Sequence, residues 1–170
     1  MRRDAEREPY RVLFLCDGNS ARSIFAECLA RREGAGRFHA FSAGRKPLGV
    51  VDPTALRVLA DHGHETSGLR SKSWNEFLAA DAPRMDFILT VCHEFGDEDC
   101  PTWPGGPMTA RWDIEDPSAL VGSEAERLRA YARAYWELLN RIRIFACLSF
   151  ESLDRLSLLR RLSEIGKGGG

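Results

Sequence analysis

The sequence has no long apolar run, no surplus of charge of one sign and few cysteines. No apolar stretch approaches the ~20 residues of a membrane span, and segment 1–9 is charged and lacks the apolar centre of a secretory signal. The formal net charge is -1, which gives no reason to expect nucleic acid or a membrane as partner. We therefore expect a cytoplasmic protein in which any affinity for an anion comes from a local site.

The cysteines are too few and too widely spaced for a disulfide scaffold. They are Cys16, Cys28, Cys92, Cys100 and Cys147. In a reducing compartment such cysteines fill the core, bind a metal or carry redox chemistry. Cys92-His93 with Cys100 lacks the second pair that would complete a zinc site, so we expect no metal. Cys28 and Cys147 lie among apolar residues and are predicted to be buried.

The length and composition indicate one globular domain. The chain has 170 residues, against the ~100–200 residues that are usual for a domain. It is 44% hydrophobic and 29% charged, which is typical of a globular protein. We predict a single domain over residues 1–170, with residues 1–9 and 166–170 as disordered tails.

Short apolar runs alternate with segments of helical periodicity. Strands are predicted over 12–16, 38–42, 87–92 and 109–114, and helices over 20–33, 53–63, from 73, over 123–146 and over 153–165. In the last helix, Leu156, Leu159 and Leu162 are expected to form the buried stripe. Nearly continuous apolar strands that alternate with helices predict an α/β fold with a four-stranded parallel sheet sandwiched by helices.

Three chemically capable side chains follow predicted strands. Cys16 ends the first strand, Cys92 ends the third, and Asp116 follows the fourth. Ligands of open α/β sheets bind outside the carboxyl ends of the strands. These three side chains are therefore expected to meet at one rim of the sheet.

The segment between the first strand and the first helix has the composition of an anion-binding loop. It reads Cys16-Asp17-Gly18-Asn19-Ser20-Ala21-Arg22-Ser23. A tight loop that enters a helix N-terminus turns its N–H groups inward and favours the thiolate form of a cysteine at its mouth. Arg22 can hold two oxygens of a tetrahedral oxyanion, and Ser23 can donate its hydroxyl to the Cys16 thiolate. Gly18 permits close backbone approach, and Asn19 tolerates a left-handed conformation.

The run Cys-x-Gly-Asn-x-x-Arg-Ser resembles the phosphate loop of the low-molecular-weight protein-tyrosine-phosphatase family, which includes arsenate reductases. The resemblance covers residues 10–165, because further motifs follow in the order seen in the arsenate reductase branch. These are Phe41-Ser42-Ala43-Gly44, Ser71-Lys72-Ser73-Trp74, Thr90-Val91-Cys92, Cys100-Pro101 and Asp116-Pro117. The resemblance implies a low-molecular-weight-phosphatase-like fold, with Cys16 as nucleophile, Arg22 as oxyanion clamp and Asp116 as general acid.

A second thiol separates a reductase from a phosphatase. A phosphatase needs one cysteine, because water resolves its intermediate, whereas arsenate reduction needs two electrons from a further thiol. Cys92 and Cys100 resemble the resolving pair of thioredoxin-linked arsenate reductases. The resemblance implies that Cys92 attacks Cys16 with release of arsenite and that Cys100 then attacks Cys92. An external thiol such as glutathione is the alternative for either of these two steps. The resemblance also implies an external thiol reductant, glutathione with glutaredoxin or thioredoxin, and no tightly bound cofactor.

Two departures from the family bear on the substrate. Ser118 and Ala119 stand where tyrosine phosphatases of the family place tyrosines, so a small oxyanion such as arsenate fits better than phosphotyrosine. Family members often carry threonine or a small apolar residue in place of Asp17. Its carboxylate is expected to disfavour the neighbouring thiolate and repel a dianion, unless it points out of the loop.

We therefore predict an arsenate reductase that serves arsenic detoxification. The alternative is a phosphatase of phosphotyrosine or small phosphoesters that uses Cys16, Arg22 and Asp116 alone. A third possibility, prompted by Asp17, is an impaired oxyanion-binding protein.

Overall fold

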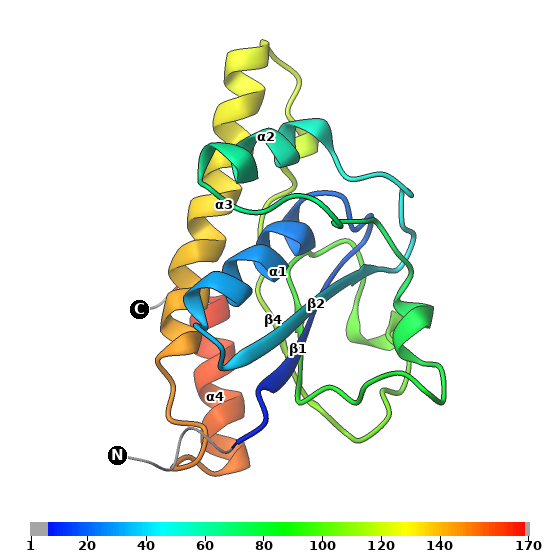
Figure 1. Cartoon of the computed structure of the whole chain (residues 1–170), viewed down its shortest axis with the longest axis vertical. Helices are drawn as coiled ribbons and strands as arrows, with labels where there is room; N and C mark the ends of the chain where they lie inside the picture. Colours follow the sequence, from blue (N-terminus) through cyan, green and yellow to red (C-terminus); the bar gives the residue numbers. More distant parts are fainter. Residues whose placement is uncertain (1–6, 169–170) are drawn as a thin grey trace.

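The computed structural model describes residues 7–168. Four parallel strands form one sheet in the order β2-β1-β3-β4, which confirms the predicted sheet. The strands are β1 (Tyr10–Cys16), β2 (Phe38–Gly44), β3 (Phe87–Thr90) and β4 (Met108–Arg111). β1 and β3 are central, and their inner residues are almost fully buried because both faces of the sheet are covered (Figure 1).

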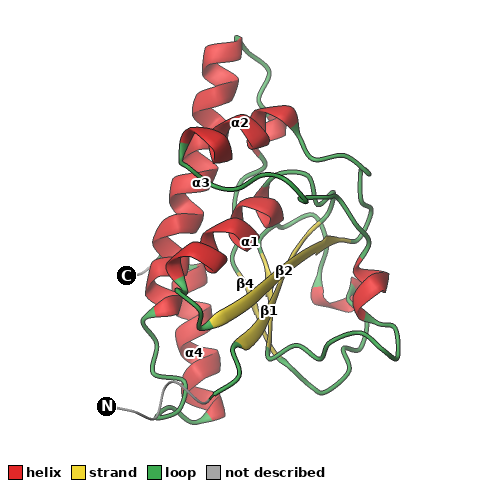
Figure 2. Cartoon of the chain, in the orientation of Figure 1, coloured by secondary structure: helices red, strands yellow, loops and turns green. Residues whose placement is uncertain are grey.

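Helices gather on one side of the sheet in the view of Figure 2, and loops that carry the short 3-10 turns at 74–77 and 97–99 lie on the other. The helices are α1 (Arg22–Glu33), α2 (Pro53–Asp61), α3 (Glu124–Ala146) and α4 (Arg155–Gly166), and the 3-10 turns are η1 (Trp74–Phe77), η2 (Asp97–Asp99) and η3 (Pro117–Ala119). α1 packs on β1 and β2, α3 packs along α1, and α4 covers β4. No helix in the described range is long and apolar enough to cross a membrane.

The link between β3 and β4 contains only the single turn η2, although parallel strands are usually joined by a helix. This link starts at the carboxyl end of β3 and contains both Cys92 and Cys100. The fold therefore places two of its five cysteines on one irregular segment at the rim that Cys16 occupies.

Some sequence predictions need correction. The buried stripe of α4 consists of Leu158, Leu162 and Ile165, whereas Leu156 is 76% exposed. Cys147 is exposed, because it caps the C-terminus of α3, while Cys28 is buried as predicted. β3 ends at Thr90 and β4 at Arg111, so both strands are shorter than predicted.

Parts of the two predicted tails lie outside the described residues, namely 1–6 and 169–170. The inner parts of these tails are placed. Arg7 forms an ion pair with Glu151 at 3.2 Å, and Gly166 is the last residue of α4. The predicted C-terminal tail thus begins within a helix.

Candidate active site

Residues 17–21 connect β1 to α1 and form a loop whose carbonyl groups point outward. Three of these carbonyls and that of the preceding Cys16 accept hydrogen bonds from backbone amides of the segment that follows β2, at 2.9 to 3.3 Å. The bonds run from Arg45, Lys46, Leu48 and Asp52 to the carbonyls of Cys16, Asp17, Gly18 and Ser20. Because the two polar groups of a trans peptide point in opposite directions, the N–H groups of the same peptides face the inside of the loop. The N-terminus of α1 opens onto the same space, and no side chain caps it.

Asn19 fixes the shape of this loop. It has φ 46, the left-handed conformation that its residue type was expected to tolerate. Its Oδ1 accepts a hydrogen bond from the backbone N–H of Lys72 at 2.9 Å, and its Nδ2 donates to Ser23 Oγ at 2.7 Å. Ser23 Oγ in turn lies 2.9 Å from Cys16 Sγ. With its oxygen accepting from Asn19, the Ser23 hydroxyl is free to donate to the Cys16 thiolate.

Arg22, the first residue of α1, is 5% exposed and is held in place by its own hydrogen bonds. Its Nη1 donates to the carbonyl of Ile114 at 3.0 Å. The two Nη atoms also donate to the two carboxylate oxygens of Glu94, at 3.2 and 2.6 Å. Glu94 was not among the predicted site residues, although its position two residues after Cys92 is a signal that places its carboxylate on the same rim.

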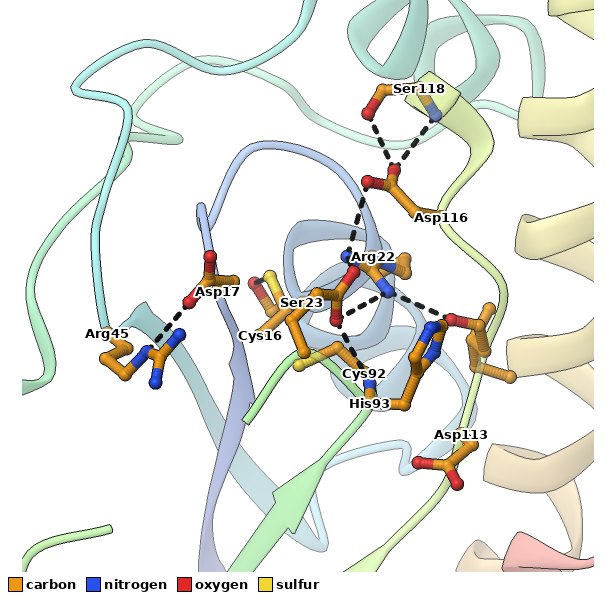
Figure 3. A network of polar contacts seen from close by, with 12 residues as sticks. Cys16, Asp17, Arg22, Ser23, Arg45, Cys92, His93, Asp113, Asp116 and Ser118 are labelled. Carbon is orange, nitrogen blue, oxygen red and sulfur yellow. Dashed lines mark hydrogen bonds and ion pairs between the residues drawn. The ribbon is translucent and has the colours of Figure 1, made fainter. Parts of the chain in front are cut away.

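Asp116 reaches Arg22 from the loop after β4, at 3.7 Å from Nη2. It caps η3 and accepts hydrogen bonds from the N–H and the hydroxyl of Ser118. Its side chain is 34% exposed, so solvent can return a proton to it. Asp116 therefore lies beside the guanidinium, at the rim of the sheet where Cys16 and Cys92 also lie (Figure 3).

Cys92 is fully buried just beyond β3, next to the strand that ends at Cys16. Burial raises the pKa of its thiol to about 12, and a hydrogen bond with Glu94 adds to that rise. Figure 3 shows Cys16, Cys92 and Arg22 in one cluster. Cys100 is half-buried, and its thiol contacts the carbonyl of Gly96 at 3.8 Å, while burial raises the pKa of that thiol as well. All five cysteines are free thiols, so Cys92 and Cys100 are not joined in this state.

A family model, low molecular weight phosphotyrosine protein phosphatase, matches residues 11–155 of the chain. The chain belongs to this phosphatase family. The match begins in β1 and ends at the first residue of α4, so it includes every candidate site residue.

Similar proteins within the phosphatase family are named arsenate reductases. The arsenate reductase of Halalkalibacterium halodurans is 30% identical over 135 residues, 79% of this chain and 94% of that protein. The crystal structure of an arsenate reductase from Archaeoglobus fulgidus superposes with a TM-score of 0.63, with 31% identity over 79% of this chain and 98% of that one. A thioredoxin-dependent arsenate reductase of Corynebacterium glutamicum has a TM-score of 0.55, with 25% identity over 84% of this chain and 66% of that one.

This member of the phosphatase family compensates the unusual carboxylate of its loop. Asp17 points away from the nucleophile and accepts a hydrogen bond from Arg45 Nε at 2.9 Å (Figure 3). The Arg45 guanidinium also lies over the ring of Phe95, at 5.0 Å from its centroid, and pairs with Asp99 at 3.6 Å. The negative charge of Asp17 is therefore paired outside the loop instead of facing an incoming anion.

Proposed function

We propose that the protein is an arsenate reductase that uses Cys16 as nucleophile and Cys92 as second thiol. The observation that carries the proposal is the fully buried Cys92 thiol beside Cys16, on the rim where the oxyanion loop opens. Hydrolysis of a phosphoester has no use for such a thiol, whereas reduction of an oxyanion requires one. The arsenate reductase names of the similar proteins support the same choice.

In the first step, the Cys16 thiolate attacks the arsenic of arsenate and a sulfur–arsenic bond forms. One arsenate oxygen leaves as water, with a proton supplied by Asp116. The inward N–H groups of the loop and the guanidinium of Arg22 stabilise the negative oxygens as the geometry at arsenic changes. Arsenic remains As(V) in this adduct.

In the second step, the Cys92 thiolate attacks Cys16 Sγ. A Cys16–Cys92 disulfide forms, the sulfur–arsenic bond breaks, and its electron pair stays on arsenic, which leaves as arsenite. Two thiols have then lost two electrons and As(V) has gained them. Cys100 next attacks Cys92, which frees Cys16 and leaves a Cys92–Cys100 disulfide.

An external dithiol or thiol must then reduce that disulfide. Thioredoxin is the first candidate, because the Corynebacterium glutamicum neighbour is a thioredoxin-dependent arsenate reductase. Glutathione with glutaredoxin is the second. The cycle needs free thiols at its start, which places the proposed activity in the reducing cytoplasm.

The test is arsenite production from arsenate by the purified protein, with thioredoxin and with glutathione plus glutaredoxin as separate donors. We expect Cys16→Ser and Cys92→Ser to abolish arsenite formation, and Cys100→Ser to slow turnover with thioredoxin. Cys147→Ser is the matched control, because Cys147 is an exposed thiol at the C-terminus of α3. This variant should keep full activity.

Hydrolysis of para-nitrophenyl phosphate is measured in parallel. Phosphatase activity that only Cys16→Ser removes, with arsenite formation lost in both Cys16→Ser and Cys92→Ser, would establish the reductase relay. Ester hydrolysis without arsenite from either donor would make the protein a phosphatase. Arsenite production that survives Cys16→Ser would contradict the whole mechanism.

A further inference from the structure

The Glu94 carboxylate occupies the two Nη atoms of Arg22, which are donors that an oxyanion could use. The carboxylate takes both Nη atoms of the guanidinium in a bidentate pair, at 2.6 and 3.2 Å. Arg22 is buried, and Nη1 is also committed to the carbonyl of Ile114, so the side chain cannot swing out to meet a ligand. An oxyanion that is to be held by the two Nη atoms must therefore displace the carboxylate.

The same carboxylate is bound to the segment that carries the second thiol. Glu94 Oε2 accepts a hydrogen bond from the backbone N–H of His93 at 3.0 Å, and it is two residues from Cys92. Glu94 adds to the effect of burial in raising the pKa of the Cys92 thiol. One side chain thus holds the oxyanion clamp and is anchored to the backbone beside the buried thiol.

We propose that Glu94 couples the two half-reactions: it competes with the oxyanion for Arg22 and, once displaced, accepts the proton of Cys92. The proton-acceptor half of this proposal rests on the proposed arsenate reductase function. The competitor half requires only that an oxyanion bind between Cys16 and Arg22.

The ion pair with Arg22 explains why the Glu94 carboxylate does not deprotonate Cys92 before an oxyanion binds. In the resting state Arg22 lowers the pKa of Glu94 to about 2, against the opposing effect of burial, so the carboxylate is a very weak base. Once an oxyanion takes the guanidinium, that stabilisation of the carboxylate is lost and its basicity rises. The Cys92 thiol therefore becomes a nucleophile only after the clamp has closed on an oxyanion.

The displaced side chain has room to move. An open depression of about 600 Å³ adjoins Glu94, and its wall includes His93, Gly96 and Asp113. The charged and titratable groups around Glu94 and Cys92 come from several elements: Arg22 of α1, Cys16 of β1, Arg111 of β4, Asp116 before η3 and the adjacent His93. The acidic residues that line the depression are Asp97, Glu98, Asp99 and Asp113. Arg111 Nη1 donates to the carbonyl of Cys92 at 2.7 Å, which keeps the thiol in place while the carboxylate moves.

The proton and electron balance of the step is complete. The Cys92 thiol gives its proton to the Glu94 carboxylate, and the thiolate attacks Cys16 Sγ in the arsenic adduct. The disulfide forms, the sulfur–arsenic bond breaks, and arsenic leaves with the electron pair. The proton on Glu94 then passes to solvent, and the carboxylate returns to Arg22.

The first experiment measures the affinity of the reduced protein for inorganic phosphate by isothermal titration calorimetry. We expect Glu94→Gln to bind phosphate at least about tenfold more tightly than the wild type, because a neutral amide competes poorly for a guanidinium. Glu98→Gln is the matched control, since it removes an equal charge from the same loop at an exposed side chain, and its affinity should change less than about threefold. Equal or weaker phosphate binding by Glu94→Gln would overturn the competitor role.

The second experiment follows a single turnover in a Cys100→Ser background, with loss of two free thiols on addition of arsenate as the readout. With Glu94 present, the rate should vary little between pH 6.5 and 8. In Glu94→Gln the rate at pH 7 should be at least about tenfold lower than in the wild type. With increasing pH the rate of this variant should rise about tenfold per pH unit, because only hydroxide can deprotonate a thiol that burial keeps protonated.

Glu94→Asp keeps a base on a shorter side chain and should recover part of the rate with the flat profile. A Glu94→Gln variant with the rate and pH profile of the wild type would overturn the proton-acceptor role. Absence of arsenite formation by the wild type would overturn the proposed function and this role with it, whereas the phosphate measurement judges the competitor role separately.

Discussion

Asp17 and Arg45 show how a single unfavourable charge is accommodated beside a nucleophile. Two unit charges a few ångströms apart interact by about 4 kcal/mol at an effective dielectric of ~20, and partial exposure reduces that figure. Arg45→Gln should therefore weaken phosphate binding about three- to tenfold, because the charge of Asp17 is then unpaired. Adding Asp17→Asn to that variant should restore the affinity, as measured by calorimetry. An equal loss in the single and double variants would mean that Arg45 acts through Phe95 or Asp99 instead.

Single residues of the site differ in how far the sequence reveals them. Cys16, Asn19 and Arg22 lie within one local motif, so their roles in the loop follow from spacing and residue type. Arg45 and Glu94 act through contacts with residues that lie 28 and 72 positions away in the chain. Such contacts depend on which strand ends become neighbours, and no local pattern encodes them.

At the level of elements, the conformation of the oxyanion loop depends on Gly44, the last residue of β2. A Cβ atom at Gly44 would lie 2.6 Å from the carbonyl oxygen of Asp17 and 3.0 Å from the N–H nitrogen of Asn19, both of them backbone atoms. Gly44→Ala should displace the loop, cost about 1–3 kcal/mol of unfolding free energy and weaken phosphate binding at least about tenfold. Gly18→Ala lies in the loop itself, yet its Cβ would meet only side-chain atoms, those of the 68% exposed Leu48 from 3.2 Å and Ser20 Oγ at 3.7 Å. Urea unfolding should find the stability of Gly18→Ala close to that of the wild type.

The order and type of the regular elements could be predicted, because continuous apolar strands and capped helices have strong local signals. Which side of α4 faces the core could not be predicted. That helix carries leucines on several sides, and its contacts with the end of β4 and the residue after it decide which side is buried. Trp112 Nε1 donates to the carbonyl of Leu162, and Gly166 lies against the backbone of Arg111. These contacts place Leu158 and Leu162 inward and leave Leu156 in solvent. The prediction was right for Leu162 and wrong for Leu156, because the deciding partner, Trp112, is 50 positions away from Leu162.

For the whole molecule, one histidine is expected to shape the dependence of stability on pH. His64, which follows α2, contacts the hydroxyl of Tyr135 on α3 at 2.7 Å, and burial lowers the pKa of His64 from 6.5 to about 4. Between these values the unfolded chain binds a proton that the folded chain does not, so the free energy of unfolding falls as the pH drops from about 6.5 toward 4.

His64→Gln should remove about 1 kcal/mol of that fall between pH 7.5 and pH 5, because glutamine can accept the same hydrogen bond without titrating. Urea unfolding at the two pH values measures the difference. His39→Gln serves as the control, since His39 is exposed on β2, and it should keep the fall of the wild type. The same fall in His64→Gln as in the wild type would assign the acid sensitivity to other groups.

The oxyanion loop offers main-chain N–H groups to a ligand, because the carbonyls of Cys16, Asp17, Gly18 and Ser20 are tied to the outside. Main-chain donors respond to charge and tetrahedral shape, and phosphate and arsenate are alike in both. Discrimination between the two anions must then arise after binding. Phosphate dissociates unchanged, while arsenate is reduced irreversibly in the redox step. A cell that relies on this protein would accordingly lose its protection as phosphate accumulates, with no change in the protein itself.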